Sequence, residues 1–320
     1  MNVDRAVDFL ENVKGNVGVF FHDDADGACS GALINSVLKD LEVTTTLACG
    51  PIDKSSFDAF KFIKTDYVII LDLAVDQYPD WLKPFDKKTT MIIDHHPLHN
   101  DLNKLGFLHI NSRFEDSKKY VSASEICMEI CKKIGLKNKD WLGRLGAVGD
   151  KSIDGEPDEQ EAAEMIDANK SVRGPESIIK IAKFLTTANK LDDFLYTTEF
   201  RKPLEIIRGE IERQMKKFEM TDMADISFFE FKGNYSMLSM LSNALFDRHP
   251  KKTIIVYRRS EGFMKVSGRS HKFDLGKIFS DATKGIGEGG GHPQASGAKM
   301  KEKDFDIFKK RVLKELEVSI

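Results

Sequence analysis

The sequence predicts an α/β protein with an N-terminal doubly wound parallel sheet and a smaller C-terminal α/β domain. In the first half, short apolar runs alternate with helical patterns, and short links join them. Apolar runs with little polar interruption are typical of parallel strands that are covered on both faces. After about residue 222 the pattern changes to strands and helices of a different texture, which indicates a separate domain.

The elements of the first domain can be placed in order along the chain. The N-terminal segment MNVDRAVDFLENVKG has the pattern of a charged amphipathic helix. The expected strands are GNVGVFFHDD, VTTTLACG, DYVIILDLA, TTMIIDHH and FLHINS, and the early helices are SGALINSVLKDLE and SSFDAFKFIKT. Residues 122–150 and 174–219 are expected to be helical, and the charged helix PLEIIRGEIERQMKKFE suits a connection between domains.

The C-terminal part contains three expected strands, ISFFEFKG, TIIVYRR and EGFMKVSGRS, with a hairpin turn at RRSEG. Its expected helices are SMLSMLSNALFDR, FDLGKIFSDATKG and KDFDIFKKRVLKELE. The predicted organisation is therefore an N-terminal domain at 1–190, a helical linker at 191–221 and a C-terminal domain at 222–320.

The charge balance limits the classes of partner. The 320 residues carry a formal net charge of −3, with a pI of about 6.3. No overall positive field attracts nucleic acid, so a site for a polyanion must be a local basic patch. No apolar run approaches the roughly 20 residues of a membrane span, and a cytoplasmic protein is expected. The four cysteines are expected to be reduced, buried and structural, because no second Cys/His pair completes a zinc site.

Three of the predicted strands end in side chains that are typical metal ligands. The first ends in the segment from His22 to Asp26, the second carries Asp72, and the third delivers Asp94, His95 and His96. A further acid, Asp150, follows the helical LGAVGD. In open parallel sheets the carboxyl ends of the strands line the ligand crevice, so these groups are expected to converge.

A single aspartate at such a position is equally often a helix cap or a turn former. Several carboxylates at one edge would repel each other unless cations neutralise them. Carboxylates with imidazoles suit manganese, and also iron, cobalt or magnesium, and the number of donors exceeds the need of one ion. The pattern therefore predicts a dinuclear site with one bridging aspartate. Asp23 is expected to point away from it, and His99 to be solvated.

The C-terminal domain contains a second candidate site. The run Gly289, Gly290, Gly291 and His292 would let backbone N–H groups approach a phosphate closely, although a lone glycine run is more often a tight turn. Arg269 ends a predicted strand and can donate two parallel hydrogen bonds to a phosphate, and Ser267 lies on the same face of that strand. A surface arginine beside Asp274 is the alternative for Arg269.

The motifs HDDADGACSGA, VIILDLA, IIDHHP and LGAVGD, in this order, resemble those of the DHH phosphoesterase superfamily. This superfamily includes RecJ-type exonucleases, nanoRNA/pAp phosphatases, cyclic-dinucleotide phosphodiesterases and family II pyrophosphatases. The later VSGRS and GEGGGHPQASGA resemble the DHHA1 domain, so the resemblance covers nearly the whole chain. The spacing from His22 to Asp26 is most similar to small archaeal RecJ-like proteins, whereas bacterial RecJ-type proteins carry Asp in place of His22.

The resemblance implies roles for these residues. His22 and Asp24 would bind one divalent ion, Asp26, His95 and Asp150 would bind the other, and Asp72 would bridge the two. Asp94 would orient the site, and His96 would contact the scissile phosphate. In the DHHA1 domain the resemblance implies that phosphate is held by the glycine-rich motif of Gly289, Gly290, Gly291 and His292, and Ser267 and Arg269 are expected to add contacts from the neighbouring strand. Mn²⁺ is the expected metal, with Mg²⁺ or Co²⁺ as alternatives.

The predicted function is that of a manganese-dependent exonuclease on single-stranded DNA, RNA or short oligonucleotides. The alternative is a small-molecule phosphodiesterase or phosphatase acting on cyclic dinucleotides or pAp. A basic, aromatic groove would favour the nuclease, and a closed cleft for one dinucleotide would favour the alternative. A third hypothesis, a non-catalytic subunit of a replication or repair assembly, would require lost ligands, and this sequence keeps them all. An active enzyme could also dock onto such a partner, for example a helicase. Polarity, DNA or RNA preference, substrate length and oligomeric state stay open.

Overall fold

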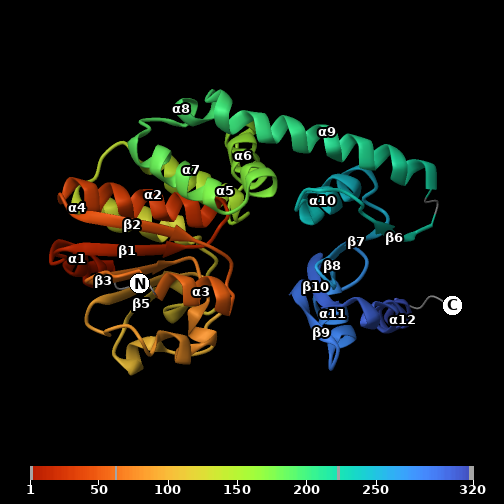
Figure 1. The fold of residues 1–320 in the computed structure, drawn as a ribbon, viewed down its shortest axis with the longest axis horizontal. Helices are drawn as coiled ribbons and strands as arrows, with labels where there is room; N and C mark the ends of the chain where they lie inside the picture. The colour runs from red at the N-terminus through yellow and green to blue at the C-terminus, as the bar shows by residue number, and fades with distance from the viewer. Residues whose placement is uncertain (1–2, 62, 222–223, 317–320) are drawn as a thin grey trace. The chain divides into compact units, whose positions relative to one another are not determined.

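The computed structural model describes residues 3–61, 63–221 and 224–316. It consists of two compact units, which divide between Leu204 and Glu205 (Figure 1). The first unit contains a parallel five-stranded sheet, and the second a smaller sheet of mixed direction. The predicted fold class is therefore confirmed. The division lies inside the long helix α9 (Thr198–Thr221), within the segment predicted as a linker.

The first sheet has the strand order β2-β1-β3-β4-β5, and every neighbouring pair is parallel. Its strands are β1 (Asn16–Phe21), β2 (Thr44–Cys49), β3 (Tyr67–Leu71), β4 (Thr90–Asp94) and β5 (Leu108–Asn111). The inner strands β1, β3 and β4 are almost wholly buried, which agrees with their uninterrupted apolar sequences. The order brings the carboxyl ends of β1, β3 and β4 next to one another.

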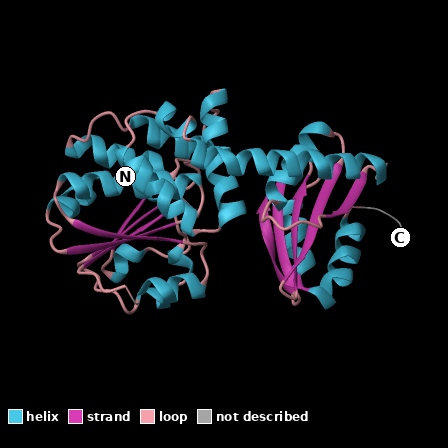
Figure 2. Cartoon of the chain, turned by 45° about the horizontal axis from the view of Figure 1, so that its top comes forward, coloured by secondary structure: helices cyan, strands magenta, loops and turns pink. Residues whose placement is uncertain are grey.

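Helices cover both faces of this sheet (Figures 1 and 2). One face packs against α1 (Val3–Glu11), α2 (Ala25–Asp40) and α4 (Ala123–Ile134). The other face packs an aromatic core around Phe20, Phe57 and Phe60 under α3 (Lys54–Lys61). Behind α2 lie α5 (Asp140–Gly149), α6 (Pro157–Arg173) and α7 (Glu176–Thr187), followed by the short α8 (Leu191–Leu195).

Helix α2 is buried on nearly all sides because α4, α5 and α7 surround it. Its sequence, ADGACSGALINSVLKD, is rich in small residues, which allow neighbouring helices to approach closely. A buried central helix of this kind is held rigidly by its neighbours. The first turn of α2 therefore occupies a fixed position at the end of β1.

The second sheet has the order β6-β7-β8-β10-β9. Its strands are β6 (Ile226–Glu230), β7 (Thr253–Ser260), β8 (Phe263–Arg269), β9 (Gly287–His292) and β10 (Ala295–Lys301). Only the β6–β7 pair is parallel. One face packs with α11 (Leu275–Thr283) and α12 (Phe305–Glu315) around Phe279 and Phe308. On the opposite face, α10 (Leu238–Arg248) packs against β7 and β8.

The glycine run at residues 289–291 differs from what its sequence suggested. It was expected to form a loop, but it lies in the edge strand β9, which pairs along its length with β10. A Cβ at Gly289 would lie 2.8 Å from the carbonyl oxygen of Phe279 on α11. The glycines are therefore needed partly because α11 packs directly on this strand. The strands β9 and β10 were both missed because a glycine-rich sequence lacks strand propensity.

Short 3₁₀ turns that the sequence analysis did not foresee connect several elements. They are η1 (Val75–Gln77), η2 (Pro79–Leu82), η3 (Leu102–Leu105), η4 (Ser112–Phe114) and η5 (Glu302–Asp304). The cysteines form no disulfide, and Cys29, Cys127 and Cys131 are buried as expected. Cys49, in contrast, is only half-buried. Among the described residues, no helix combines the length and apolar character that a bilayer span requires.

Candidate active site

The ends of β1, β3 and β4 bring the predicted metal ligands together. His22 follows β1 directly, Asp72 follows β3, and Asp94 and His95 mark the end of β4. The strand order makes these three ends neighbours, and Asp150 reaches the same place from the end of α5. The expected convergence is therefore found in the structure.

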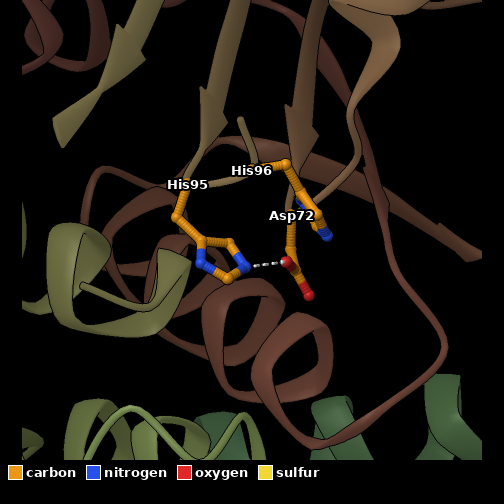
Figure 3. Close-up of side chains that lie close together, drawn as sticks. All are labelled: Asp72, His95 and His96. Carbon is orange, nitrogen blue, oxygen red and sulfur yellow. Dashed lines mark ion pairs between the residues drawn. The ribbon is translucent and has the colours of Figure 1, made fainter. Parts of the chain in front are cut away.

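Three overlapping groups of side chains each have ligand atoms within 4.8 Å of one another. The groups are His22, Asp24 and Asp72; Asp72, His95 and His96; and Asp26, His95 and Asp150. Asp72 and His95 each belong to two groups and lie at the centre. Figure 3 shows the imidazole of His95 directed at the carboxylate of Asp72, and its Nε2 is 3.2 Å from Asp72 Oδ1.

Several atoms at this centre are buried but have no hydrogen-bond partner. They are Asp72 Oδ2, both ring nitrogens of His95, and Asp150 Oδ2. Buried polar atoms are nearly always paired, so a group of unpaired polar atoms around one point needs an explanation. Divalent cations would pair with these atoms, since carboxylate oxygens and imidazole nitrogens are their usual ligands. The residues present therefore fit a pair of metal ions.

The electrostatics of the metal-free cluster lead to the same conclusion. Burial raises the pKa of Asp72 well above its usual value, and the charges of Asp26 and Asp24 raise it further. Burial likewise raises the pKa of Asp26 to about 6 and, with the charge of Asp26, the pKa of Asp150 to about 7. Burial and the charge of His96 lower the pKa of His95 to about 4, which leaves a neutral imidazole. Cations would stabilise the charged carboxylates.

Asp72 also has an unusual backbone conformation. Its φ is +58°, in the left-handed region that residues other than glycine, asparagine and aspartate rarely adopt. The conformation is held by the hydrogen bond from the Asp72 N–H to the carbonyl oxygen of Ile93, 2.9 Å away on β4. Aspartate is one of the few residues other than glycine that tolerate this conformation, which suits Asp72 to the position.

The first turn of α2 fixes two more of the predicted ligands. Asp24 is the N-cap of α2 and accepts a hydrogen bond from the Gly27 N–H at 3.0 Å, so it combines the capping role with a place in the cluster. Asp26 accepts hydrogen bonds from the backbone N–H groups of Ala123 and Ser124, at 2.8 and 2.9 Å. These N–H groups belong to the N-terminus of α4, which orients the carboxylate.

Close packing of α2 against its neighbours depends on glycine. A Cβ at Gly27 would lie only 2.1 Å from the carbonyl oxygen of His22. On the facing helix α5, a Cβ at Gly149 would lie 2.4 Å from the Cβ of Ala25 on α2. Because these glycines adjoin predicted ligands in the sequence, the approach of the helices determines where Asp26 and Asp150 lie.

His96 and Asp94 form a pair beside the cluster. His96 Nδ1 is 2.7 Å from Asp94 Oδ1, and the Asp94 side chain is buried while that of His96 is partly exposed. Burial lowers the pKa of His96, but the charge of Asp94 and this hydrogen bond outweigh it and raise the pKa to about 9. The predicted orienting role of Asp94 thus has a geometric basis, since its contact with Nδ1 leaves Nε2 of His96 available.

The sequence analysis missed three residues around the cluster. Arg113 donates through Nε to the carbonyl oxygen of His95 at 2.8 Å, and the ring of Tyr120 lies edge-on to that of His95. Both follow β5, so the rule applied to the other strand ends could have found them. Lys170 on α6 pairs with Asp23 Oδ1 at 2.6 Å, but the same oxygen lies 3.7 Å from Nε2 of His22, so Asp23 borders the cluster and does not simply point away from it as expected. His99 is exposed, as expected.

In the second unit, the register places four of the six predicted phosphate ligands, Ser267, Arg269, Gly290 and His292, on one face of the sheet. Directly paired residues point to the same side, so Arg269 on β8, Ala295 on β10 and His292 on β9 form one row. The next row consists of Ser267, Gly297 and Gly290. We call this side of β8, β9 and β10 the open face; its residues are Phe263, Lys265, Ser267, Arg269, Glu288, Gly290, His292, Ala295, Gly297, Lys299 and Lys301.

The three predicted glycines therefore divide into two kinds. Gly290 lies on the open face, and no atom lies within 4 Å of the place of its absent Cβ. Gly289 and Gly291 alternate with it and point to the opposite face, on which α11 packs. Only Gly290 among them presents bare backbone to a ligand on the open face.

Arg269 is held in place from the α10 side. Its Nε donates to Asn243 Oδ1 at 2.6 Å, and its Nη1 donates to the carbonyl oxygen of Gly268 at 2.7 Å. Ser267 is buried and lies 2.8 Å from the Oγ of Ser242. Asp274 instead caps α11, so the alternative of a surface arginine paired with it is wrong. His292 is exposed.

Comparison with known proteins agrees with both halves of this description. The model of the N-terminal domain of the DHH family matches residues 16–149, and the model of the DHHA1 domain matches residues 224–317. The chain belongs to the DHH family. The resemblance found in its motifs is thus confirmed, and DHH-family membership supports a phosphoesterase activity. None of the curated proteins searched matches the chain.

Solved structures share this DHH-family fold. RecJ from Thermus thermophilus in complex with Mn²⁺ has a TM-score of 0.74 and 14% identity, covering 97% of this chain and 54% of its own. An exonuclease RecJ bound to manganese has a TM-score of 0.70 and 14% identity, with coverages of 100% and 95%. An exopolyphosphatase-related protein from Bacteroides fragilis has a TM-score of 0.58 and 16% identity, with coverages of 98% and 95%. The chain thus spans about half of the Thermus RecJ chain.

Proposed function

We propose that the chain is a manganese-dependent exonuclease that hydrolyses single-stranded DNA, RNA or short oligonucleotides. The observation that carries the proposal is the buried centre around Asp72 and His95, where unpaired ligand atoms of a DHH-family chain converge. The RecJ structures with the same fold, solved with manganese, support the choice of metal and of reaction.

The geometry supports a division of the ligands into two sets. His22 and Asp24 would hold one ion, and Asp26, His95 and Asp150 the other, with Asp72 common to both. Bound divalent ions would lower the pKa of a water molecule and offset the negative charge on phosphate oxygens. The neutral state of His95 suits a ligand, because a protonated imidazole cannot bind a cation.

His96 would act on the substrate directly. It is partly exposed, and with Asp94 at Nδ1 it can donate a hydrogen bond from Nε2 to a phosphoryl oxygen. Its raised pKa keeps the imidazole protonated at neutral pH, so the donated hydrogen bond would be charge-assisted. Such a donor stabilises the charge that develops on phosphate during attack.

The row formed by Arg269 and His292 would bind a substrate phosphate, with Ser267 and the bare backbone of Gly290 beside it. Arginine suits this task because its planar group can donate two parallel hydrogen bonds. Retention of a strand end by these groups would favour hydrolysis near the terminus. This is the reason for proposing an exonuclease rather than an endonuclease.

A time course with oligonucleotides labelled at either end tests the proposal. DNA and RNA substrates of several lengths are incubated with Mn²⁺, Mg²⁺ or Co²⁺, and a cyclic dinucleotide and pAp are assayed in parallel. We expect single-nucleotide laddering from one end with Mn²⁺. Turnover of the cyclic dinucleotide or pAp alone would instead establish a small-molecule phosphodiesterase. The matched control is Asp72→Asn, which keeps the shape of the side chain but removes its charge.

A further inference from the structure

Asp23 is a buried acid beside the cluster that belongs to none of the three ligand groups. It is only 2% exposed, and a buried carboxylate is costly unless an opposite charge pairs with it. The pairing charge is that of Lys170, whose Nζ lies 2.6 Å from Asp23 Oδ1. Separation of this pair would leave a buried charge without its partner, so the pair is a fixed element at the margin of the cluster.

Lys170 extends from a helix that its surroundings hold in place. Helix α6 packs against α5 and α7, and the preceding residue, Asn169, is fully buried and donates from Nδ2 to the carbonyl oxygen of Phe200 at 2.7 Å. Burial lowers the pKa of Lys170, but the charge of Asp23 and the hydrogen bond to it outweigh burial and raise the pKa, so Lys170 stays charged. Lys170 thus anchors the carboxylate of a residue that lies 147 positions earlier in the chain.

The two ring nitrogens of His22 face different carboxylates. Nδ1 is 2.5 Å from Asp24 Oδ2 and 3.7 Å from Asp72 Oδ2, so it is the nitrogen on the side of the ligand group. Nε2 faces the Asp23 oxygen that Lys170 holds, at 3.7 Å. A nitrogen that binds a cation must be unprotonated, so the proton of the neutral ring would then be on Nε2. Asp23 lies where a carboxylate favours that tautomer.

We propose that Asp23 and Lys170 are positioning residues for His22. Asp23 fixes the orientation and the tautomer of the imidazole, and Lys170 keeps Asp23 beside Nε2 and prevents it from turning toward the ion. The inference rests on the proposed function, because it requires a divalent ion in the cluster. A histidine that binds a metal nearly always gives its other N–H to a carboxylate, a carbonyl or water, and this partner strongly affects metal affinity.

The positive charge of Lys170 gives the proposal a distinctive sign. A positive charge beside a cation site repels the ion, so electrostatics alone predicts that removal of Lys170 strengthens Mn²⁺ binding. Loss of positioning predicts the opposite, because Asp23 is released and the ring of His22 loses its partner. We expect the loss to dominate, since the side chain of Lys170 is 35% exposed and its charge is screened by solvent and by Asp23.

The test is a titration of the metal-free protein with Mn²⁺, in which the free ion is counted from its paramagnetic resonance signal. The variants are Lys170→Met, which removes the charge, Lys170→Arg, which keeps it, and Asp23→Asn, which keeps the shape of the side chain. The matched control is Lys133→Met. It breaks the 2.5 Å ion pair of Lys133 with Asp4, which also joins two distant segments, α4 and α1. Melting temperatures are recorded for every variant.

We expect the wild-type protein and the control to bind two Mn²⁺ ions with the same affinities. Lys170→Met and Asp23→Asn should bind one of the two ions about 10–100-fold more weakly and leave the other unchanged. Lys170→Arg should restore the affinity, because it keeps both charge and donors. In a His22→Gln background neither change should weaken Mn²⁺ binding further, because both act through His22.

Contrary results separate the inference from the proposed function. If Lys170→Met binds both ions as the wild type does, or more tightly, the positioning role is wrong, while end-labelled laddering would still support the exonuclease. A lower melting temperature with unchanged Mn²⁺ binding would make the pair a structural contact only.

Equal weakening with and without His22 would show that the pair acts on another part of the cluster, which also overturns the inference. Asp23→Asn creates no buried charge, so it gives the same decision even if the methionine variant does not fold. If the wild-type protein binds no Mn²⁺, the proposed function fails and the inference fails with it.

Discussion

The cluster in the first unit and the open face of the second hold their polar side chains in different ways. The cluster consists of short Asp and His side chains that are mostly buried, and backbone N–H groups hold some of them, such as Asp26. The open face presents Lys265, Lys299 and Lys301, which are long, exposed and unpaired with any described acid. Chemistry needs fixed geometry, whereas attraction of a phosphate chain needs mainly charge.

The difference implies that the two regions contribute to different kinetic quantities. Changes in the cluster should lower kcat, because the groups that act on the reacting phosphate lose their positions. Changes on the open face should raise KM, because they weaken contacts made equally in the ground state and the transition state. The predictions below test this separation.

The largest effect is expected for Asp72→Asn. Loss of the shared ligand should lower kcat by far more than the 10–100-fold typical of an outer-shell change. Asparagine tolerates the positive φ of this position, so the fold should be kept. Because the buried carboxylate is repelled by Asp26 and Asp24, the metal-free variant should also melt at a higher temperature than the wild type. Scanning calorimetry and titration with Mn²⁺ check both statements, and near-normal turnover would show that Asp72 is not shared.

A change on the open face of the second unit should leave kcat nearly unchanged. Arg269→Ala removes charged donors from the row with His292, and a charge-assisted hydrogen bond contributes about 1.5–3 kcal/mol. KM for a dinucleotide should therefore rise by about 10–100-fold. Steady-state kinetics with Asn243→Ala, which removes only the partner of Arg269, give the matched comparison. A fall in kcat with unchanged KM would break the proposed separation.

Asp94→Asn should alter the pH profile. The raised pKa of His96 depends on the charge of Asp94, so the acid form of the imidazole would be lost at lower pH in the variant. The alkaline limb of the kcat profile should move down from near pH 9, and kcat at neutral pH should fall by about 10–100-fold. An unchanged alkaline limb would assign it to a group other than His96.

A smaller effect is expected for the dependence of metal affinity on pH. In the metal-free protein the pKa of Asp150 is about 7 and that of Asp26 about 6, so below these values a cation must displace protons. Affinity for Mn²⁺ should therefore rise with pH through this range, by up to about tenfold per pH unit for each proton displaced. Calorimetric titration in buffers of different ionisation enthalpy would detect the released protons, and their absence would contradict the pKa assignments.

The smallest effect is expected from two glycines of the second sheet. Gly289→Ala should destabilise the protein by about 1–3 kcal/mol, because the new methyl group would meet the Phe279 carbonyl oxygen at 2.8 Å. Gly297→Ala should be tolerated, since its nearest neighbour is 3.6 Å away. Thermal melts of both variants test whether β9 and β10 have one face packed against α11 and one uncovered face, and equal losses would argue against it.

The sequence was sufficient to predict the first sheet and most of the cluster. The strands were recognisable because burial on both faces requires uninterrupted apolar runs, and their ends then place His22, Asp72 and His95 together. The charged helical segments were equally clear from their periodicity. In these regions the burial of apolar side chains determines both the local sequence pattern and the final structure.

The rest depends on contacts that the local sequence does not contain. β9 forms because α11 packs against it, and nothing in GEGGGH alone favours a strand. Lys170 approaches Asp23 from a helix 147 residues later in the chain, so no spacing rule reveals the pair. The side on which Gly290 lies follows only from the register with β10. Such features require the tertiary structure.

Position 27 has a consequence for how the side-chain cluster of the first unit is maintained. Its missing side chain lets the first turn of α2 rest directly on the end of β1, with 2.1 Å between a hypothetical methyl carbon and the His22 oxygen. An alanine there would lift the helix and displace ligands on both sides of it at once, although residue 27 itself supplies no donor atom. Tolerance of the cluster to substitution is thus limited by an atom that is absent, and an inventory of donor atoms would overlook this residue.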